Sequence, residues 1–243
     1  SRRRQNRRAG RRGKRPVAID ADVKRRLSPL RLPARQMRDV FETLFGAYGP
    51  QGWWPADSPF EVAVGAVLTQ NTAWPNVEKA ISQLCDRDLL TLESLLSAEA
   101  ACVADAIRPS GYFNLKAGRL LSLCRVLQAC DGLEGLAHWS LDRQRNGLLD
   151  VHGIGPETAD DILLYALEQP VFVIDTYTRR LLQRLGVARG DEPYEVLREG
   201  FERSLGPDVG LYNEYHALIV RHAKVSCRKT PVCEGCVLRP QCA

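Results

Sequence analysis

Hydrophobic residues recur along most of the chain with the spacing of helices rather than strands. Met37, Val40, Phe41 and Leu44 follow the i, i+3, i+4, i+7 pattern that places apolar side chains on one helix face. Runs of alternating β-branched residues, which would indicate strands, are few. Similar patterns predict helices over residues 59–69, 75–85, 94–107, 115–130 and 196–205, and another around Leu181, Leu182 and Leu185. The pattern therefore predicts an all-α fold.

A glycine-containing segment interrupts this helical pattern. Residues 151–155 (VHGIG) contain Gly153 and Gly155, and Pro156 and Glu157 follow. A glycine N-cap, a proline at the first helical position and an acid in the first turn are typical of a helix start. Unpaired backbone N–H groups at such a start can bind a phosphate oxygen. A turn that only connects two helices is an equally good interpretation of this segment alone.

The charges are distributed unevenly. The chain has 34 Lys and Arg and 29 Asp and Glu, for a net charge of +5. Residues 1–16 hold eight arginines and Lys14 without an acidic residue, so they carry +9. Residues 17–220 carry −8, and the last 23 residues carry +4. As a bulk value the net charge indicates nucleic acid only weakly, but the basic residues lie at the two ends of an acidic body.

The composition favours an intracellular globular protein. At 44% hydrophobic and 26% charged residues, disorder is expected only in the basic arm. The longest apolar runs, such as residues 62–68, are far shorter than the roughly 18 residues of a membrane span. The basic start is followed by VAID at residues 17–20 rather than by the apolar core of a signal peptide. We therefore expect the protein to act in the cytoplasm or nucleoid, with no membrane partner.

Four of the eight cysteines crowd into the last 17 residues, with the spacing C-x5-C-x2-C-x5-C. They are Cys227, Cys233, Cys236 and Cys242. Four thiolates can hold a zinc ion or a [4Fe–4S] cluster. Structural zinc usually takes two closely spaced pairs, whereas here one C-x2-C pair is flanked by two distant cysteines. The spacing favours the [4Fe–4S] cluster over zinc, and unliganded or disulfide-bonded cysteines are the third interpretation.

Three motifs together resemble the helix-hairpin-helix DNA glycosylase superfamily of endonuclease III. They are VHGIGPETA at residues 151–159, VIDT at residues 173–176 and the C-terminal four-cysteine loop. In addition, SPFEVAVGAVLTQNT at residues 58–72 is similar to the second helix and lesion-facing turn of that family. The resemblance implies two α-helical domains with a lesion pocket between them and a C-terminal [4Fe–4S] cluster loop.

The resemblance also implies a division of the chain. Residues 58–169 would form a six-helix domain that carries the helix-hairpin-helix motif. Residues 29–57 and 170–243 would form a discontinuous helical domain with the iron–sulfur loop. Residues 1–28 would be a disordered basic arm.

Asp175 matches the essential aspartate of the family and follows the apolar segment 170–174 (PVFVI). Such a carboxylate can stabilise the oxocarbenium-like sugar as the base departs, and it can orient or deprotonate the attacking water. An aspartate at a helix start also commonly caps the helix. Both roles are compatible, and the motif favours catalysis by Asp175.

Two positions depart from other branches of the family. Glu157 stands where bifunctional members carry a Schiff-base lysine, so no imine forms and β-elimination loses its route. Ala66 stands where adenine-mismatch glycosylases carry a general-acid glutamate. The sequence therefore predicts a monofunctional enzyme without AP lyase activity, and it argues against mismatched adenine as the substrate.

Aromatic residues indicate the lesion. Trp53, Trp54 and Pro55 precede the second helix, Trp74 follows the lesion-facing turn, and RPSGYFNLKA occupies residues 108–117. Together they resemble the 3-methyladenine DNA glycosylase branch of the superfamily. Electron-rich rings attract a cationic alkylpurine by stacking and by cation–π interaction. Packing in the core is the alternative role of these tryptophans.

The sequence predicts contacts with DNA in three places. The gap-filling polar residue of the family falls on Asn71, next to Gln70, and the hairpin glycines are candidates for phosphate contact. Two basic residues inside the cysteine loop either press on phosphates or form a solvated surface. The predicted contact residues are Gln70, Asn71, Gly153, Gly155, Arg228 and Lys229.

Taken together, these features predict a monomeric, monofunctional DNA N-glycosylase of base excision repair. It would flip an N3- or N7-alkylated purine out of double-stranded DNA, hydrolyse the glycosidic bond and leave an abasic site. One alternative is a glycosylase for oxidised or mismatched pyrimidines in the same fold. Another is a lesion-binding protein without catalysis.

Overall fold

A computed structural model describes residues 30–243 of the chain, and these residues form helices and loops without a strand. The prediction of an all-α fold is therefore confirmed for the described part. The predicted basic arm, residues 1–28, lies outside the described residues. Within the described range, none of the helices combines the length and apolar character that crossing a membrane requires.

The elements are twelve described α-helices with three short helical turns between or after them. The helices are α2 (Ala34–Tyr48), α3 (Pro59–Leu68), α4 (Trp74–Asp86), α5 (Leu92–Ser97), α6 (Ala100–Ala106), α7 (Phe113–Ala129), α8 (Gly132–Ala137), α9 (Leu141–Leu149), α10 (Pro156–Asp161), α11 (Thr176–Arg184), α12 (Tyr194–Leu205) and α13 (Val209–Val225). The turns are the 3-10 turns η1 (Arg108–Ser110) and η3 (Arg239–Gln241) and the π-helical turn η2 (Ile162–Ala166).

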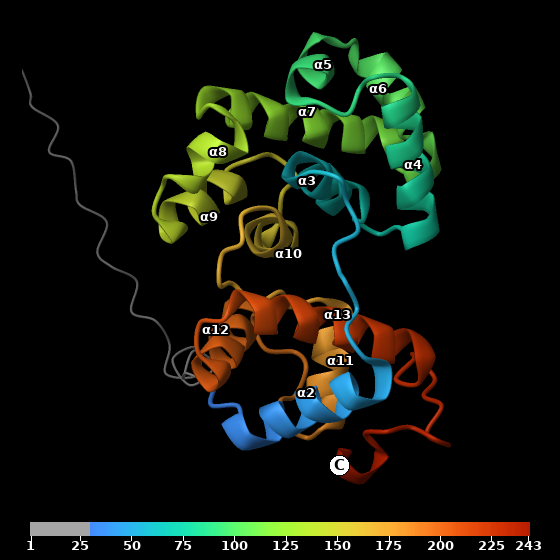
Figure 1. Cartoon of the computed structure of the whole chain (residues 1–243), viewed down its shortest axis with the longest axis vertical. Coiled ribbons are helices and arrows are strands. Elements are labelled where there is room, and N and C mark those ends of the chain that lie inside the picture. The colour runs from blue at the N-terminus through green and yellow to red at the C-terminus, as the bar shows by residue number, and fades with distance from the viewer. Residues whose placement is uncertain (1–29) are drawn as a thin grey trace, which may run out of the picture.

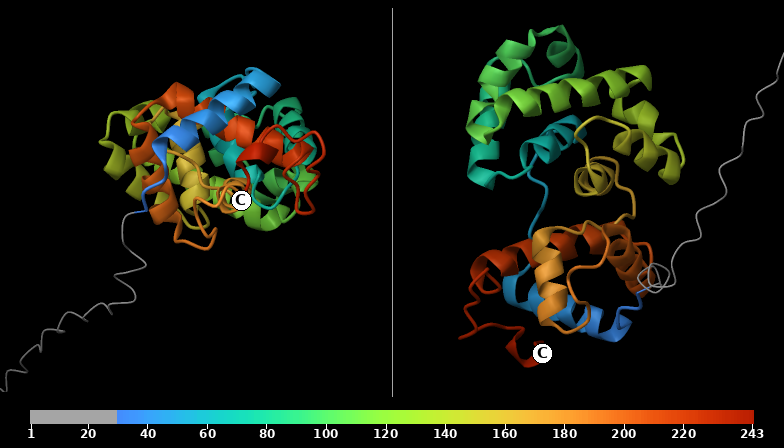
Figure 2. Two further views of the ribbon diagram at one scale, coloured as in Figure 1. Left: turned by 90° about the horizontal axis from the view of Figure 1, so that it is seen from below. Right: turned by 180° about the vertical axis from the view of Figure 1, so that it is seen from behind.

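The helices form two groups, with α3 and α10 between them (Figure 1). In one group, α7 packs against α5, α6 and α8, and α4 packs against α6. In the other group, α13 packs against α2 and α11, and α2 also packs against α12. The view from behind shows the same division (Figure 2). The turn η2 contacts both α3 and α13, so the two groups meet at this turn.

The helix starts that bound the site form as the sequence predicts. Gly155 is the N-cap of α10, and Pro156 is the first residue of that helix. Asp175 is the N-cap of α11, because its carboxylate accepts a hydrogen bond of 2.7 Å from the backbone N–H of Thr178. Both caps fix a helix N-terminus beside the extended segment 171–174.

The segment 171–174 is extended and fully buried, with no residue more than 1% exposed. Phe172 stacks on Phe201 of α12, with ring centroids 3.7 Å apart. The backbone N–H of Phe172 donates to Glu202 at 3.0 Å, which satisfies a polar group that no helix serves. This packing fixes the position of Asp175, the next residue in the chain.

Two expectations differ from the structure. The helix predicted over residues 94–107 is broken into α5 and α6, because Ala98 and Glu99 adopt extended conformations with ψ of 149° and 138°. The segment 58–169 contains eight α-helices, α3 to α10, rather than six, since α5, α6, α8 and α10 are separate helices of six or seven residues. The domain boundaries at residues 57/58 and 169/170 stay a prediction.

Candidate active site

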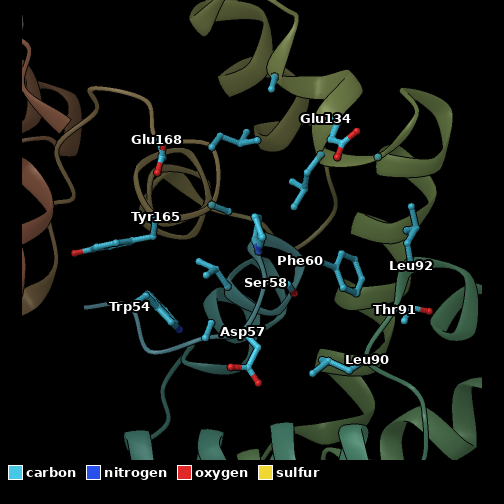
Figure 3. A pocket seen from close by; sticks show the side chains of 18 of the residues that line it. Trp54, Asp57, Ser58, Phe60, Leu90, Thr91, Leu92, Glu134, Tyr165 and Glu168 are labelled. Atoms are coloured by element: carbon cyan, nitrogen blue, oxygen red, sulfur yellow. The ribbon is translucent and has the colours of Figure 1, made fainter. Parts of the chain in front are cut away.

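Trp54 lies between two cavities. The larger cavity, about 900 Å³, is lined by Phe60 and Tyr165 and has carboxylates at Asp57, Glu134 and Glu168 (Figure 3). It does not include Asp175, and its carboxylates would repel the phosphates of DNA. The larger cavity is therefore not the candidate active site, despite its size.

The second cavity, about 700 Å³, contains the residues that the sequence analysis predicts for catalysis and base binding. It lies between the two groups of helices, since the lining comes from the turn after α3, from α10, from the start of α11 and from α13. The predicted residues that line it are Trp53, Trp54, Gln70, Asn71, Trp74 and Asp175.

The other predicted residues lie outside the lining of this cavity. Pro55 is exposed and lines neither cavity, although its neighbours Trp53 and Trp54 do. Gly153 and Gly155 lie in the hairpin turn. Arg228 and Lys229 are exposed in the C-terminal loop.

Asp175 is only 9% exposed, yet its carboxyl group loses its proton readily. Burial would by itself raise the pKa of its carboxyl group. The contact with His216 and the hydrogen bond from Thr178 outweigh burial, so the pKa lies below the usual value for aspartate. The carboxylate is therefore ionised at neutral pH, as stabilisation of a cationic sugar requires.

His216 of α13 and Tyr165 of η2 support Asp175, and the sequence analysis missed both. The Nε2 atom of His216 lies 3.6 Å from an Asp175 carboxylate oxygen. The Tyr165 hydroxyl lies 2.5 Å from His216 Nδ1, where it can donate and leave the ring proton on the nitrogen that faces Asp175. The sequence does contain a signal for α13, because Tyr212, Tyr215, His216 and Ile219 have the i, i+3, i+4, i+7 spacing of one helix face.

Two further carboxyl groups, Glu157 and Asp161, line the same cavity from α10. They are four residues apart and therefore lie on one face of the helix. The pKa of Glu157 is raised, first by burial of the carboxyl group and then by the charge of Asp175, although the residue as a whole is exposed. Burial also raises the pKa of Asp161 well above its usual value, and neighbouring carboxylates add to this effect.

The three tryptophans contact one another. The ring centroids of Trp53 and Trp74 are 4.6 Å apart with an interplanar angle of 61°, and those of Trp54 and Trp74 are 5.4 Å apart at 81°. A flat base between two parallel rings needs roughly 7 Å, twice the usual stacking distance. A base can therefore stack on the cluster but cannot lie between these rings unless one of them moves.

Gly65 of α3 allows Trp54 to approach the helix. A Cβ atom at this position would lie 3.0 Å from Trp54 Cζ2 and 3.2 Å from Trp54 Nε1. Such contacts are too short for an unchanged ring position. The glycine therefore sets how closely the Trp54 ring lies against the helix that forms one wall of the cavity.

Gln70 connects the turn after α3 to the hairpin. Its Nε2 donates to the carbonyl of Gly153 at 3.1 Å and to the Thr158 hydroxyl at 2.9 Å, and its Oε1 accepts from Arg119. These bonds occupy both ends of the side-chain amide. The structure therefore places Gln70 in a supporting position, whereas Asn71 is exposed, with a left-handed φ of 53°.

Lys116 of α7 also binds the turn after α3. Its ammonium group donates to the carbonyl of Leu68 at 2.7 Å, the hydroxyl of Thr72 at 2.6 Å and the carbonyl of Ser110 at 2.8 Å. Burial, with a smaller effect of the Arg119 charge, lowers the pKa of Lys116 to about 8. Lys116 therefore joins α3, the lesion-facing turn and η1 through one buried side chain.

The four C-terminal cysteines lie near one another. The pKa of Cys242 is raised by burial and then by the thiols of Cys236, Cys227 and Cys233. Four neighbouring thiols are the donor set of a [4Fe–4S] cluster, so the residues present fit that group. No group of three or more His, Cys, Asp or Glu side chains within residues 30–243 has the arrangement of a metal-ion site. The cluster therefore stays a prediction.

Two arginines of α11 hold the cysteine loop, and the sequence analysis missed both. Arg180 Nε donates to the carbonyl of Cys227 at 2.8 Å. Arg184 donates to the sulfur of Cys227 at 3.1 Å and to the carbonyl groups of Arg228 and Lys229 at 2.8 and 3.1 Å. The helix that begins at Asp175 thus also carries the loop.

Comparison with known proteins gives a consistent assignment. The family model described as HhH-GPD superfamily base excision DNA repair protein matches residues 64–207 of this chain. The protein named Putative DNA repair glycosylase from Methanocaldococcus jannaschii is 43% identical over 206 residues, which are 84% of this chain and 94% of that protein. Endonuclease III of Sulfolobus acidocaldarius is 29% identical over 187 residues, or 75% of this chain and 81% of that enzyme.

Solved structures include similar folds. The H. pylori 3-methyladenine DNA glycosylase MagIII, bound to 1,N6-ethenoadenine, has a TM-score of 0.69 at 30% identity and covers 79% of this chain and 98% of its own. A non-covalent endonuclease III–DNA complex has a TM-score of 0.73 at 22% identity and covers 87% of this chain and 95% of its own, which shows the fold alone. The chain belongs to the HhH-GPD superfamily, and it is a DNA glycosylase of base excision repair.

We predict that Lys116→Met destabilises the protein and loosens the lesion-facing turn. The substitution leaves the carbonyl groups of Leu68 and Ser110 buried without the ammonium donor, which costs about 1–3 kcal/mol. Urea unfolding should show this loss of free energy. Lys79→Met on the exposed face of α4 is the matched control and should leave stability nearly unchanged. Equal effects of the two substitutions would show that the buried hydrogen bonds do not stabilise the turn.

Proposed function

We propose that the protein is a monofunctional DNA N-glycosylase that removes alkylated purines of the 3-methyladenine type from double-stranded DNA and leaves an abasic site. The observation that carries the proposal is one cavity that contains an ionised, buried carboxylate and three tryptophan rings. The carboxylate provides the hydrolytic chemistry, and the rings provide a surface for a flipped base.

Asp175 would act on the sugar of the flipped nucleotide. As the bond between the base and the sugar breaks, positive charge develops on the sugar, and the ionised carboxylate stabilises it. The same group can orient the attacking water or accept its proton. Because Asp175 also caps α11 and faces His216, its position is fixed before the substrate binds.

The tryptophan cluster supports an electron-poor purine as the lesion. A cationic alkylpurine stacked on Trp53 or Trp74 gains cation–π attraction in addition to stacking. A base that is already cationic leaves without further protonation, so Ala66 need not be an acid. The similarity to the H. pylori 3-methyladenine glycosylase over 79% of the chain favours the same branch.

For base binding, DNA contact and assembly we propose roles that the sequence analysis predicts. Asn71 is exposed at the cavity and is suited to fill the space of the flipped nucleotide. The hairpin turn at Gly153 and Gly155, together with Arg228 and Lys229, would contact phosphates. We propose that the protein acts on DNA as a monomer inside the cell.

We also propose that Cys227, Cys233, Cys236 and Cys242 hold a [4Fe–4S] cluster. When bound, the cluster supplies iron–thiolate bonds that fix the C-terminal loop. Arg180 and Arg184 already tie this loop to α11 through Cys227. The cluster would therefore hold Arg228 and Lys229 in place for DNA, and Asp175 would carry out the chemistry.

Endonuclease III-like action on oxidised or mismatched pyrimidines is the second candidate. Endonuclease III of Thermotoga maritima is 30% identical over 185 residues, which makes this branch a close alternative. A panel of duplexes that each contain one lesion separates the two candidates. Release of alkylated purines rather than pyrimidine lesions supports the first.

Asp175→Asn is expected to abolish release of 3-methyladenine from duplex DNA while DNA binding is retained. The amide carries no charge to stabilise the cationic sugar, and it cannot accept a proton. Base release under single-turnover conditions and DNA affinity are the two measurements. A variant that releases the base as fast as the wild type would contradict the mechanism. Binding without release in the wild type would indicate a lesion-binding protein.

Borohydride is expected to trap no covalent complex between the wild-type protein and lesion-containing DNA. Glu157 occupies the position of the Schiff-base lysine and provides no amine. Gel electrophoresis of the borohydride-treated reaction tests this prediction. The Glu157→Lys variant provides the comparison, because it restores an amine at that position. A trapped complex with the wild type would show that another amine supports lyase chemistry.

Protein purified without oxygen is expected to absorb near 400 nm and to contain about four iron atoms per chain. Cys233→Ser should lower both signals, because it removes one proposed thiolate. Cys85→Ser, at an exposed position of α4, is the control and should retain them. One zinc atom per chain with no absorbance near 400 nm would indicate a zinc site and contradict the cluster.

A further inference from the structure

Asp161 is a buried carboxyl group in the base cavity that the proposed mechanism does not use. The residue is 8% exposed and lines the cavity one helical turn after Glu157. It makes no hydrogen bond or ion pair with any residue in the described range 30–243. Its neighbour Asp160 differs, because Arg145 binds that carboxylate at 2.7 Å. The carboxylate oxygens of Asp161 are not among the fully enclosed polar atoms that lack a partner, so they open into the cavity, where a ligand can contact them.

The surroundings of Asp161 favour the neutral acid form of its carboxyl group. Burial is the main reason that its pKa is raised, and the charges of Glu157, Asp175 and Asp160 add to it. Across the cavity, α3 contributes Ala66, which has no charge. The titratable and charged groups that line the cavity or lie close to Asp161 are Glu157, Asp160, Tyr165, Asp175, Tyr177, Tyr194, His216 and Lys224.

The same cavity is therefore lined by one carboxyl group whose pKa is raised, Asp161, and one whose pKa is lowered, Asp175. Environments that separate the ionisation of two carboxyl groups are a recurring arrangement for acid and base catalysis. The residue that α3 contributes to the cavity at this point is Ala66, which carries no acid, and α10 packs directly against that helix. Asp161 thus provides from α10 an acid that α3 lacks.

We propose that Asp161 is the general acid for the departing base, and that it allows this pocket to excise uncharged purine lesions as well as cationic alkylpurines. The inference rests on the proposed function, because it concerns the substrate range of the same cavity. An uncharged purine would leave as an anion unless a ring nitrogen is protonated, whereas a cationic base needs no such proton.

The proton balance of the step is complete. The Asp161 carboxyl group gives its proton to a ring nitrogen of the flipped base as the glycosidic bond breaks, and the electron pair of that bond goes to the base. Water adds to the sugar carbon and gives its proton to Asp175. Solvent then returns a proton to Asp161 and accepts one from Asp175. The products are a neutral base and an abasic sugar.

Asp161 is preferred to Glu157 for this role on geometric grounds. Glu157 is exposed as a residue, although its carboxyl group is partly enclosed, whereas Asp161 is only 8% exposed. A general acid is most effective where water does not compete for its proton. Glu157 therefore serves as the matched comparison in the test.

The experiment compares two lesions in one protein preparation. Duplexes that contain 1,N6-ethenoadenine, an uncharged lesion, or 7-methylguanine, a cationic lesion, are incubated with excess enzyme, and base release is measured. Wild-type protein should release both bases. Asp161→Asn should slow release of ethenoadenine by about 100-fold or more, the usual contribution of a general acid, and leave release of 7-methylguanine nearly unchanged.

The pH dependence provides a second readout. Because the acid form of Asp161 is the active one, the wild-type rate on ethenoadenine should fall as the pH rises through the pKa of Asp161. The rate on 7-methylguanine should not fall in that range. In Asp161→Asn the difference between the two profiles should disappear, which loss of packing alone would not cause.

Controls separate the possible outcomes. Asp160→Asn removes a carboxylate that is paired with Arg145 outside the cavity, so it should affect both lesions equally. A partly unfolded variant would also lower both rates together. Selective loss of ethenoadenine release in Glu157→Gln but not in Asp161→Asn would overturn the assignment of the acid. Equal loss on both lesions in Asp161→Asn would overturn it as well.

The same measurements distinguish this inference from the proposed function. If wild-type protein releases 7-methylguanine but not ethenoadenine, the inference fails and the proposed function stands. If it releases neither base, the proposed function fails, and the inference fails with it.

Discussion

The buried contact among Tyr165, His216 and Asp175 is the interaction on which the site depends. It joins the turn η2, which also packs against α3, to the helix α13 and to the N-cap of α11. Burial alone would favour the neutral form of the Asp175 carboxyl group, and the contact with His216 reverses this preference. The contact that ties η2 to α13 and α11 thus also keeps the carboxylate ionised.

The cavity assigns different states to carboxyl groups that lie close together. Asp175 has partners that stabilise its charge, whereas Asp161 has none among the described residues and lies beside other carboxylates. Like charges in a poorly solvated space disfavour one another, so the pKa of the group without a partner is the one that is raised. One cavity can therefore present both a base and an acid to a flipped nucleotide. The rings of Trp53, Trp54 and Trp74 line the same cavity.

The helix α11 connects the proposed catalytic carboxylate to the loop that we propose to contact DNA. Its N-cap is Asp175, and its later residues Arg180 and Arg184 bind the backbone of the cysteine loop. A shift of the loop would therefore act on the helix that positions the carboxylate. At the opposite wall, Lys116 and Gln70 bind the lesion-facing turn to α7 and to the hairpin. Side-chain hydrogen bonds therefore fix both the cysteine loop and the turn after α3.

The sequence by itself determined the helical class, the hairpin turn, the cap at Asp175 and the family, because these depend on local spacing and on short motifs. It did not reveal the break at Ala98, the supporting roles of Lys116 and His216 or the raised pKa of Asp161. Those features depend on which side chains meet after folding: His216 lies 41 residues from Asp175 in the chain, and Lys116 bonds to a carbonyl 48 residues away. Burial and neighbouring charge decide the protonation of a carboxyl group, and only the tertiary structure provides both.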